Sequence, residues 1–188
     1  MTQKMRGRGG APVHRRAALA TVGAGLVSAM GGASAYAKSK ATPVRPGDEK
    51  FMRLAIAEAA KGDFAFGAVI VREGKVVSTG RNMGLTNNDP TAHGEMVAIR
   101  RFVAENPAKA LKGATLYTSG EPCPMCMGAI VWCGLGRVVY GASIEQLSKR
   151  LGQIMMTSEA VATAAPFLTV EITGGVLAQE ALALFDKK

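Results

Sequence analysis

The sequence holds few cysteines, histidines and aromatic residues. Its 188 residues include three cysteines, two histidines and one tryptophan, and aromatic residues make up only 5%. The cysteines stand at positions 123, 126 and 133. An odd number of cysteines this close together excludes a disulfide framework, and it leaves metal binding as the use to examine.

Long apolar runs are also missing. Residues 17–30 form a weakly apolar run of 14 residues, shorter than the roughly 20 that a membrane-spanning helix needs. No internal repeat or low-complexity tract is present. Hydrophobic residues make up 48% of the chain, which is ordinary for a globular protein of one domain. We therefore expect no membrane span in the mature chain.

Acidic residues are absent from the first 37 positions, which instead hold five lysines and arginines. The basic stretch ends in Arg15-Arg16, the apolar run follows, and Ala35-Tyr36-Ala37 offers small residues for a signal peptidase. This order resembles a twin-arginine signal, although no bulky apolar residue follows the pair. We predict that residues 1–37 are an export signal and that the mature protein is periplasmic. The alternative is a cytoplasmic protein whose translation starts later.

The charge outside this segment is modest. The chain has a formal net charge of +9, and removal of the five basic residues of 1–37 leaves +4. No basic run remains in residues 38–188, so the sequence offers little to attract a polyanion.

Residues 38–47 read as a linker, and residues 48–188 as one domain in which helices and strands alternate. Asp48 suits an N-cap, and Glu73-Gly74 suits the turn of a hairpin. Pro122 suits the first residue of a helix. This order predicts an α/β fold with three α/β/α layers and a five-stranded mixed sheet. Helices are expected over 48–61, 92–106, 122–134, 144–164 (with a break near Gly152) and 176–185, and strands over 65–71, 75–80, 112–119, 137–140 and 167–172.

Two short motifs carry the chemistry of the chain. His93 and Glu95 stand two residues apart in the first, and Pro122 precedes the cysteines of Cys123-Pro124-Met125-Cys126 in the second. A zinc site with an open fourth position needs three protein ligands, and His93, Cys123 and Cys126 supply them. Glu95 would not bind the metal but would move protons between water and a substrate nitrogen. H-x-E followed by P-C-x-x-C is a signature of zinc-dependent base deaminases.

Other interpretations of these residues remain open. The two cysteines could form a disulfide or a structural zinc clip, with Cys133 as a fourth ligand. Glu95 could be a helix N-terminal acid that complements the helix dipole. Both motifs are expected at helix starts, where partial positive charge would lower the pKa of the thiols and help to keep both as thiolates.

Over residues 48–184 the chain resembles the cytidine and deoxycytidylate deaminase superfamily. Within it, the resemblance is to the branch of guanine deaminases, fungal-type cytosine deaminases and bacterial tRNA adenosine deaminases. The resemblance implies the same fold, a zinc ion, hydrolytic release of ammonia and a homodimer. The matching segments are 66–71, 80–82, 88–95, 116–119 and 121–130.

The resemblance also suggests substrate-binding residues. Asn82 matches the position where the family holds an asparagine against the substrate, and its amide can both donate and accept hydrogen bonds. Phe66 and Trp132 are candidate pocket walls, because flat bases stack on aromatic rings. The alternatives are a turn asparagine and two core aromatics.

The signals for one branch are mixed. Gly94 matches the fungal cytosine deaminases, residues 141–145 lack the segments expected of either other branch, and residues 170–177 resemble the tRNA deaminases. We expect a zinc-dependent hydrolytic deaminase of a small nucleobase or nucleoside, of the guanine or cytosine type. The alternatives are a tRNA adenosine deaminase and a non-catalytic zinc-binding protein of the same fold. An exported protein would not meet nucleic acid.

Overall fold

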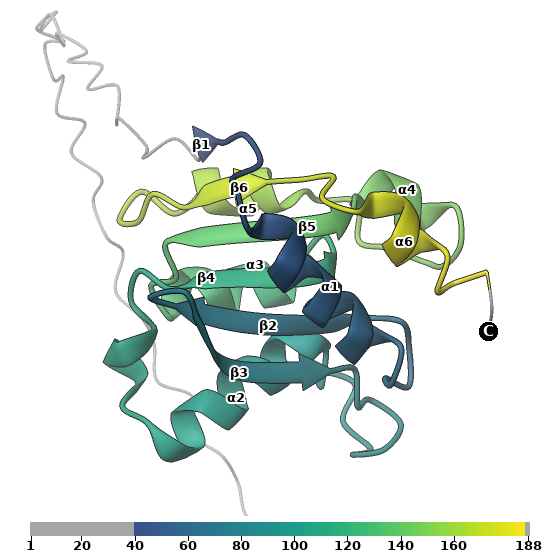
Figure 1. Cartoon of the computed structure of the whole chain (residues 1–188), viewed down its shortest axis with the longest axis horizontal. Coiled ribbons are helices and arrows are strands. Elements are labelled where there is room, and N and C mark those ends of the chain that lie inside the picture. Colours follow the sequence, from purple (N-terminus) through teal and green to yellow (C-terminus); the bar gives the residue numbers. More distant parts are fainter. Residues whose placement is uncertain (1–39, 187–188) are drawn as a thin grey trace, which may run out of the picture. The chain divides into compact units, whose positions relative to one another are not determined.

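The computed structural model describes residues 40–186, and the predicted export signal over residues 1–37 lies outside them. A mixed sheet has the strand order β1-β6-β5-β4-β2-β3 (Figure 1). The strands β4, β5, β6 and β1 run parallel, whereas β2 is antiparallel to both β4 and β3. Their bounds are β1 Lys40–Ala41, β2 Gly67–Arg72, β3 Lys75–Arg81, β4 Thr115–Gly120, β5 Arg137–Ala142 and β6 Glu171–Thr173.

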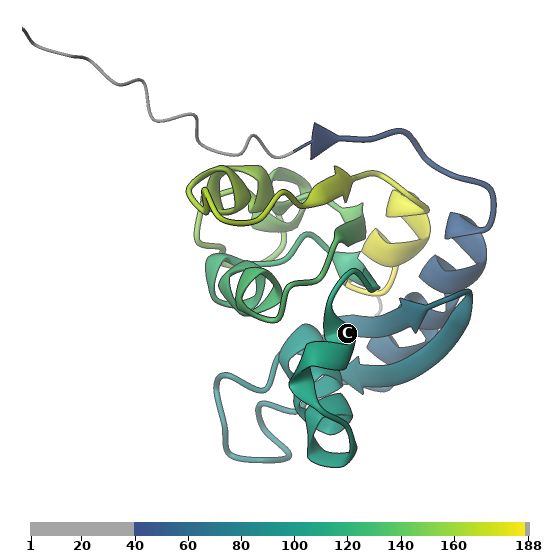
Figure 2. The same ribbon diagram turned by 90° about the vertical axis from the view of Figure 1, so that its left-hand side faces the viewer.

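Helices cover both faces of this sheet. Figure 2 shows α1 (Asp48–Ala59) and α6 (Ala178–Leu182) on one side, and α3 (Pro124–Trp132) and α5 (Ser158–Thr163) on the other. Helix α2 (Gly94–Glu105) packs on β3 and β2, and its apolar residues join those of α3 and α5 in the larger core cluster. Two short elements complete the set, the 3-10 helix η1 (Ala108–Leu111) and α4 (Ile144–Ser148). Within residues 40–186, no helix combines the length and apolarity that crossing a bilayer requires.

The architecture confirms the expected three layers and the five-stranded mixed sheet, to which β1 adds a two-residue sixth strand. This strand falls in the segment read as a linker, and it pairs with β6. The prediction of a mostly helical stretch over 144–164 was wrong in extent. Helix α4 ends at Ser148 and α5 begins at Ser158, so the break near Gly152 is a nine-residue non-helical segment, 149–157.

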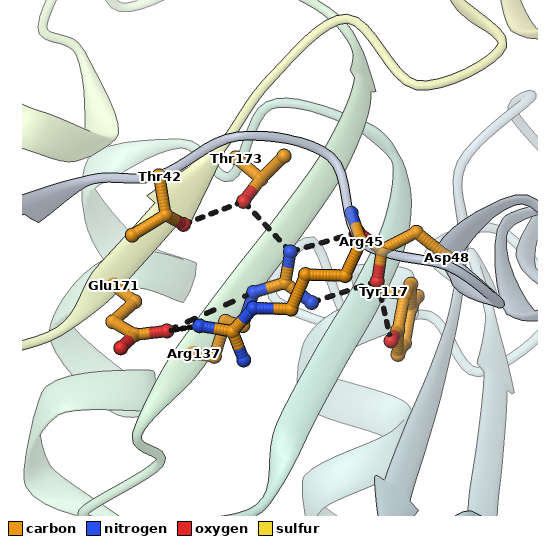
Figure 3. A network of polar contacts seen from close by, with 7 residues as sticks. All are labelled: Thr42, Arg45, Asp48, Tyr117, Arg137, Glu171 and Thr173. Carbon is orange, nitrogen blue, oxygen red and sulfur yellow. Dashed lines mark hydrogen bonds and ion pairs between the residues drawn. The ribbon is translucent and has the colours of Figure 1, made fainter.

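Asp48 does more than begin a helix. It is the first residue of α1, with Gly47 rather than Asp48 as the N-cap, and its carboxylate is buried (Figure 3). Both guanidinium Nη atoms of Arg137 donate to it at 2.7 and 2.8 Å, and the Tyr117 hydroxyl donates at 2.9 Å. The backbone N–H of Arg45 adds a fourth bond at 2.7 Å. The start of α1 is thereby fixed to the first residue of β5 and to β4.

The Arg137 guanidinium extends this network toward β6. Its Nη2 also donates to Thr173 Oγ1 at 2.9 Å, and its Nε lies 3.9 Å from Glu171 Oε2. That Nε has no hydrogen-bond partner within the described part of the chain. Arg45, which precedes α1, pairs with the same Glu171 carboxylate. Strands β4, β5 and β6 therefore share one buried polar anchor with the segment that leads into α1.

The Asp48–Arg137 pair makes stability depend on pH. Burial alone would raise the pKa of Asp48, but the hydrogen bonds from Arg137 and Arg45 outweigh it and hold this pKa below its usual value. A carboxyl whose pKa is depressed on folding stabilises the native state above its unfolded pKa of about 3.9. That contribution is lost as the pH falls through the folded pKa.

We expect Asp48→Asn to lower the free energy of unfolding by about 3–5 kcal/mol at pH 7, the usual cost of leaving one buried charge without its partner. Asparagine keeps the shape but offers one acceptor oxygen, and its amide N–H groups would face the donors of Arg137. Urea unfolding of both proteins between pH 3 and 7 measures this loss. The difference between them should shrink as the pH falls below about 4, where the wild-type carboxyl takes up a proton first in the unfolded chain and then, at lower pH, in the folded one.

Glu49→Gln is the matched control for this substitution. Glu49 is the next residue of the same helix, is exposed, and contacts only Arg53 across 3.5 Å among the ion pairs of residues 40–186. An exposed pair of this kind contributes about 0–1 kcal/mol. Equal losses of unfolding free energy in the two variants would show that the buried Asp48–Arg137 pair stabilises the protein no more than an exposed pair does.

Candidate active site

Four segments that are distant in sequence meet at one edge of the sheet. The parallel strands β4 and β5 end there, at Gly120 and Ala142, which are register partners. The antiparallel strand β2 begins at the same edge, where its Gly67 pairs with Arg81 at the end of β3. The loops at the carboxyl ends of parallel strands are the usual place for a site in α/β proteins.

His93, Cys123 and Cys126 come together at this edge. The His93 Nδ1 atom lies 3.7 Å from Cys123 Sγ and 3.6 Å from Cys126 Sγ, and the three ligand atoms all lie within 4.8 Å of one another. Zinc bonds of about 2.3 Å to sulfur and 2.0–2.1 Å to nitrogen, at tetrahedral angles, place such atoms about 3.6–3.8 Å apart. One nitrogen and two sulfurs at these separations fit a zinc ion with an open fourth position.

Helix starts hold all three side chains. His93 is the N-cap of α2 and Cys123 the N-cap of α3, and their carbonyls accept the N–H groups of Val97 and Met127. Pro124 is the first residue of α3, where a missing N–H costs nothing. The prediction placed Pro122 in that role, two residues early. Both helix starts at the site were otherwise anticipated.

Close backbone packing fixes the start of α2. A Cβ atom added to Gly94 would lie 3.0 Å from Gly67 Cα and 3.1 Å from Phe66 O. The space at Gly80 of β3 is smaller still, because a Cβ atom added there would lie 2.1 Å from Gly94 O. The absence of side chains lets the helix lie directly on β2 and β3, so the imidazole of His93 is held by rigid elements.

Glu95 is the second residue of α2, and its carboxyl is buried, with 4% of the residue exposed. Thr118 Oγ1 donates to its Oε1 at 3.4 Å. Burial raises the pKa of Glu95 above its usual value. A carboxyl with a raised pKa beside a metal-binding cluster has the property that a general acid and base requires.

The two thiols of the cluster differ in acidity. The hydrogen bond from Cys126 lowers the pKa of Cys123 to about 4, while donating it raises the pKa of Cys126 well above its usual value. The hydrogen bond with Cys123 raises the pKa of His93 as well. The predicted pair of thiolates therefore needs a further positive charge, which a zinc ion would supply by favouring the deprotonated forms.

A cavity of about 260 Å³ opens above these residues. It is smaller than the roughly 300–1,000 Å³ of pockets that take drug-sized ligands, so it suits a compact molecule. Within the described residues, no lysine or arginine lines it. The lining residues are Phe64, Phe66, Asn82, His93, Glu95, Glu121, Cys123, Leu151, Gly152, Gln153 and Ile154.

Asn82 and Phe66, both expected from the sequence, lie in this cavity. Asn82 is buried, and its Oδ1 accepts the N–H of Gly84 at 3.1 Å. This bond leaves the amide nitrogen, which has no protein partner among residues 40–186, as a donor for an acceptor atom on a ligand. Phe66 packs edge-on against Phe185 at 5.2 Å, which fixes the plane of its ring.

Trp132 and Cys133 do not lie in this cavity. Trp132 is 81% exposed and stacks on Phe167 at 5.2 Å, beside a separate depression on α3 and α5. Its expected role as a pocket wall therefore finds no support in the structure. Cys133 packs against the core, and burial raises the pKa of its thiol. It stands outside the His93–Cys123–Cys126 cluster, so the structure gives no support to a four-ligand site.

More than half of the residues that line the cavity were not predicted from the sequence. Phe64, Glu121 and four residues of segment 149–157 line it, and none of them was proposed. The break expected near Gly152 was the available signal, because a loop between two short helices at a strand edge is well placed to cover a site.

Comparison with known proteins identifies the family. Residues 45–142 match the model of the cytidine and deoxycytidylate deaminase zinc-binding region, which is more than half of the chain. The protein belongs to this family of deaminases, and zinc is its cofactor.

Guanine deaminases and tRNA adenosine deaminases are both among its relatives. The chain is 46% identical to the guanine deaminase of Bacillus subtilis over 99 residues, which are 50% of this chain and 64% of that protein, slightly less than two thirds of its length. It is 36% identical to the tRNA-specific adenosine deaminase of Haemophilus influenzae over 138 residues, 71% of this chain and 78% of the relative. The solved guanine deaminase of Nitrosomonas europaea shares the fold, with a TM-score of 0.64 and 22% identity over 80% of this chain and 87% of that one.

Proposed function

We propose that this protein is a zinc-dependent hydrolase that deaminates a small nucleobase or nucleoside, of the guanine or cytosine type. One observation carries the proposal: the buried carboxyl of Glu95 lies beside His93, Cys123 and Cys126 at the wall of a compact cavity. The reaction replaces the exocyclic amine of the ring by a carbonyl oxygen from water and releases ammonia.

Each residue then has a defined task. His93, Cys123 and Cys126 hold the zinc ion, which when bound lowers the pKa of a water molecule to about 7. Glu95 would take a proton from the attacking water and deliver protons to the ring nitrogen and to the departing amine. A single carboxyl can serve all of these transfers because it acts as a base when ionised and as an acid once protonated.

The remaining cavity residues orient the ring. The Asn82 amide nitrogen donates to an acceptor on the base, and guanine and cytosine both offer ring nitrogens and a carbonyl oxygen. Phe66 supplies a flat apolar surface against the ring. The small volume, and the lack of lysine and arginine among the described residues that line the cavity, favour a free base or nucleoside over a nucleic acid, whose phosphates attract these side chains.

A tRNA adenosine deaminase is the second candidate. The match to the Haemophilus influenzae tRNA-specific enzyme covers more of this chain than the match to the guanine deaminase does. This candidate requires a cytoplasmic protein, whereas the first is compatible with the export that residues 1–37 suggest. Recovery of the intact N-terminus from the cytoplasmic fraction of the native host would favour the tRNA substrate.

Ammonia release decides among these candidates. We expect the purified, zinc-loaded protein to release ammonia from guanine or cytosine, or from their nucleosides, and not from adenosine in tRNA. Turnover of tRNA alone would establish the second candidate. No turnover of any base, nucleoside or tRNA would favour a non-catalytic zinc protein of this fold.

A further inference from the structure

Glu121 is a buried carboxylate that the proposed chemistry does not use. It precedes Pro122 and Cys123, it is 6% exposed, and its side chain is bonded to the starts of two helices. The N–H of Ile144 donates to its Oε2 and the N–H of Ser158 to its Oε1, each at 2.9 Å. These are the first residues of α4 and α5.

The two bonds lie on either side of segment 149–157. This segment supplies Leu151, Gly152, Gln153 and Ile154 to the cavity. Its middle is exposed, and Ile154 and Met155 have about two thirds of their surface in solvent. Within residues 40–186, the exposed Arg150–Asp186 pair is the one ion pair that this segment makes. Its position therefore depends on how α4 and α5 are held.

Further bonds connect the same points to the metal-binding loop. Ser158 Oγ donates to the Pro122 carbonyl at 3.1 Å, and the Glu121 N–H donates to Ala142 at the end of β5. The loop that carries Cys123 and the two helices that carry segment 149–157 thus form one hydrogen-bonded unit.

The chemistry of this position calls for a carboxylate. Two backbone donors approach two different oxygens of one side chain, and each bond to an ionised acceptor is stronger than a neutral one. Glutamine has a single acceptor oxygen, and its amide nitrogen would face one of the two N–H groups. An unpaired buried N–H is costly, so glutamine would release one end of the segment.

We propose that Glu121 is a positioning residue that holds segment 149–157 over the zinc site and thereby sets the affinity for substrate. The inference rests on the proposed deaminase function and deepens it, because it assigns the wall of the cavity to a specific support. Since the Glu121 carboxylate bonds to the N–H groups of Ile144 and Ser158, and within residues 40–186 to neither the metal ligand atoms nor Glu95, its loss should weaken binding more than it slows the chemical step.

The test compares Glu121→Gln with Glu145→Gln in the zinc-loaded enzyme. Glu145 is an exposed acid in the first turn of α4, so its substitution removes the same charge without touching the two N–H bonds. With guanine and cytosine as probes, Glu121→Gln should raise KM about tenfold and lower kcat less than threefold, with zinc retained. Glu145→Gln should match the parent. An unchanged KM in Glu121→Gln, or a loss of zinc with a matching fall in kcat, would overturn the proposal.

Amide hydrogen exchange tests the support without substrate. In the parent protein, the amides of Ile144 and Ser158 should exchange much more slowly than those of residues 152–155, and in Glu121→Gln at least one should speed up about tenfold. Fast exchange of both amides in the parent would refute the support even if the variant failed to fold. A parent that binds zinc and protects these amides but deaminates nothing would contradict the proposed function and, with it, the role in substrate affinity, while leaving the structural tie intact.

Discussion

Glu95→Gln is expected to lower kcat by about 10²–10⁴-fold or more, while zinc content and fold stay as in the parent protein. Glutamine keeps the size of the side chain and an oxygen that can accept from Thr118 Oγ1, but it cannot take up or release a proton. This range is typical of general acid–base catalysis, and the loss can exceed it because Glu95 serves several proton transfers. Steady-state ammonia release and metal analysis on the same sample measure the two quantities.

Glu105→Gln provides the control for this substitution. Glu105 is the last residue of the same helix, is exposed, and lies outside the cavity. Its substitution should leave both kcat and zinc content unchanged. If Glu95→Gln released ammonia at nearly the parent rate with zinc in place, then another group would have to carry the protons.

Cys123→Ala is expected to lose nearly all bound zinc, starting from about one ion per chain. A three-ligand site that loses a thiolate keeps one nitrogen and one sulfur, which is too few to hold zinc against dilution. Activity should disappear with the metal. Metal analysis after gel filtration, together with circular dichroism to show that the chain is folded, measures the effect.

The third cysteine offers a matched control. Cys133→Ala makes the same substitution at the C-terminal end of α3, where the cysteine side chain packs against the core and not against His93. It should retain zinc and activity. Full zinc occupancy in Cys123→Ala, or equal loss in Cys133→Ala, would contradict the ligand set.

The metal-binding residues could be predicted because their geometry is local. His93 and Cys123 are helix caps, and Cys126 lies one turn after Cys123, so short motifs fix where each side chain points. Helix geometry also explains why Trp132 lies outside the cavity. It follows Cys126 by six residues, which at about 100° per residue turns it away from the face that carries Cys126 and Ile130.

Other features depend on contacts between distant segments. Asp48 looked like a helix cap, and only the fold shows Arg137, 89 residues later, bound to it in the core. Segment 149–157 has no periodic pattern from which its place over the cavity could be predicted. No sequence motif around Glu121 predicts that it bonds to the N–H groups of Ile144 and Ser158. Such contacts form when the sheet brings strand ends together, so they cannot be predicted from spacing along the sequence.

The two ends of strand β5 belong to two different parts of the protein, one that stabilises the fold and one that forms the site. Arg137 begins this strand within the buried anchor, and Ala142 ends it beside the metal-binding loop, roughly 16 Å away at 3.3 Å per residue. Substitutions that far apart are expected to act additively. A lineage could therefore exchange the residues of the cavity wall, and with them the preferred base, while the anchor at the opposite end keeps the chain above its folding threshold.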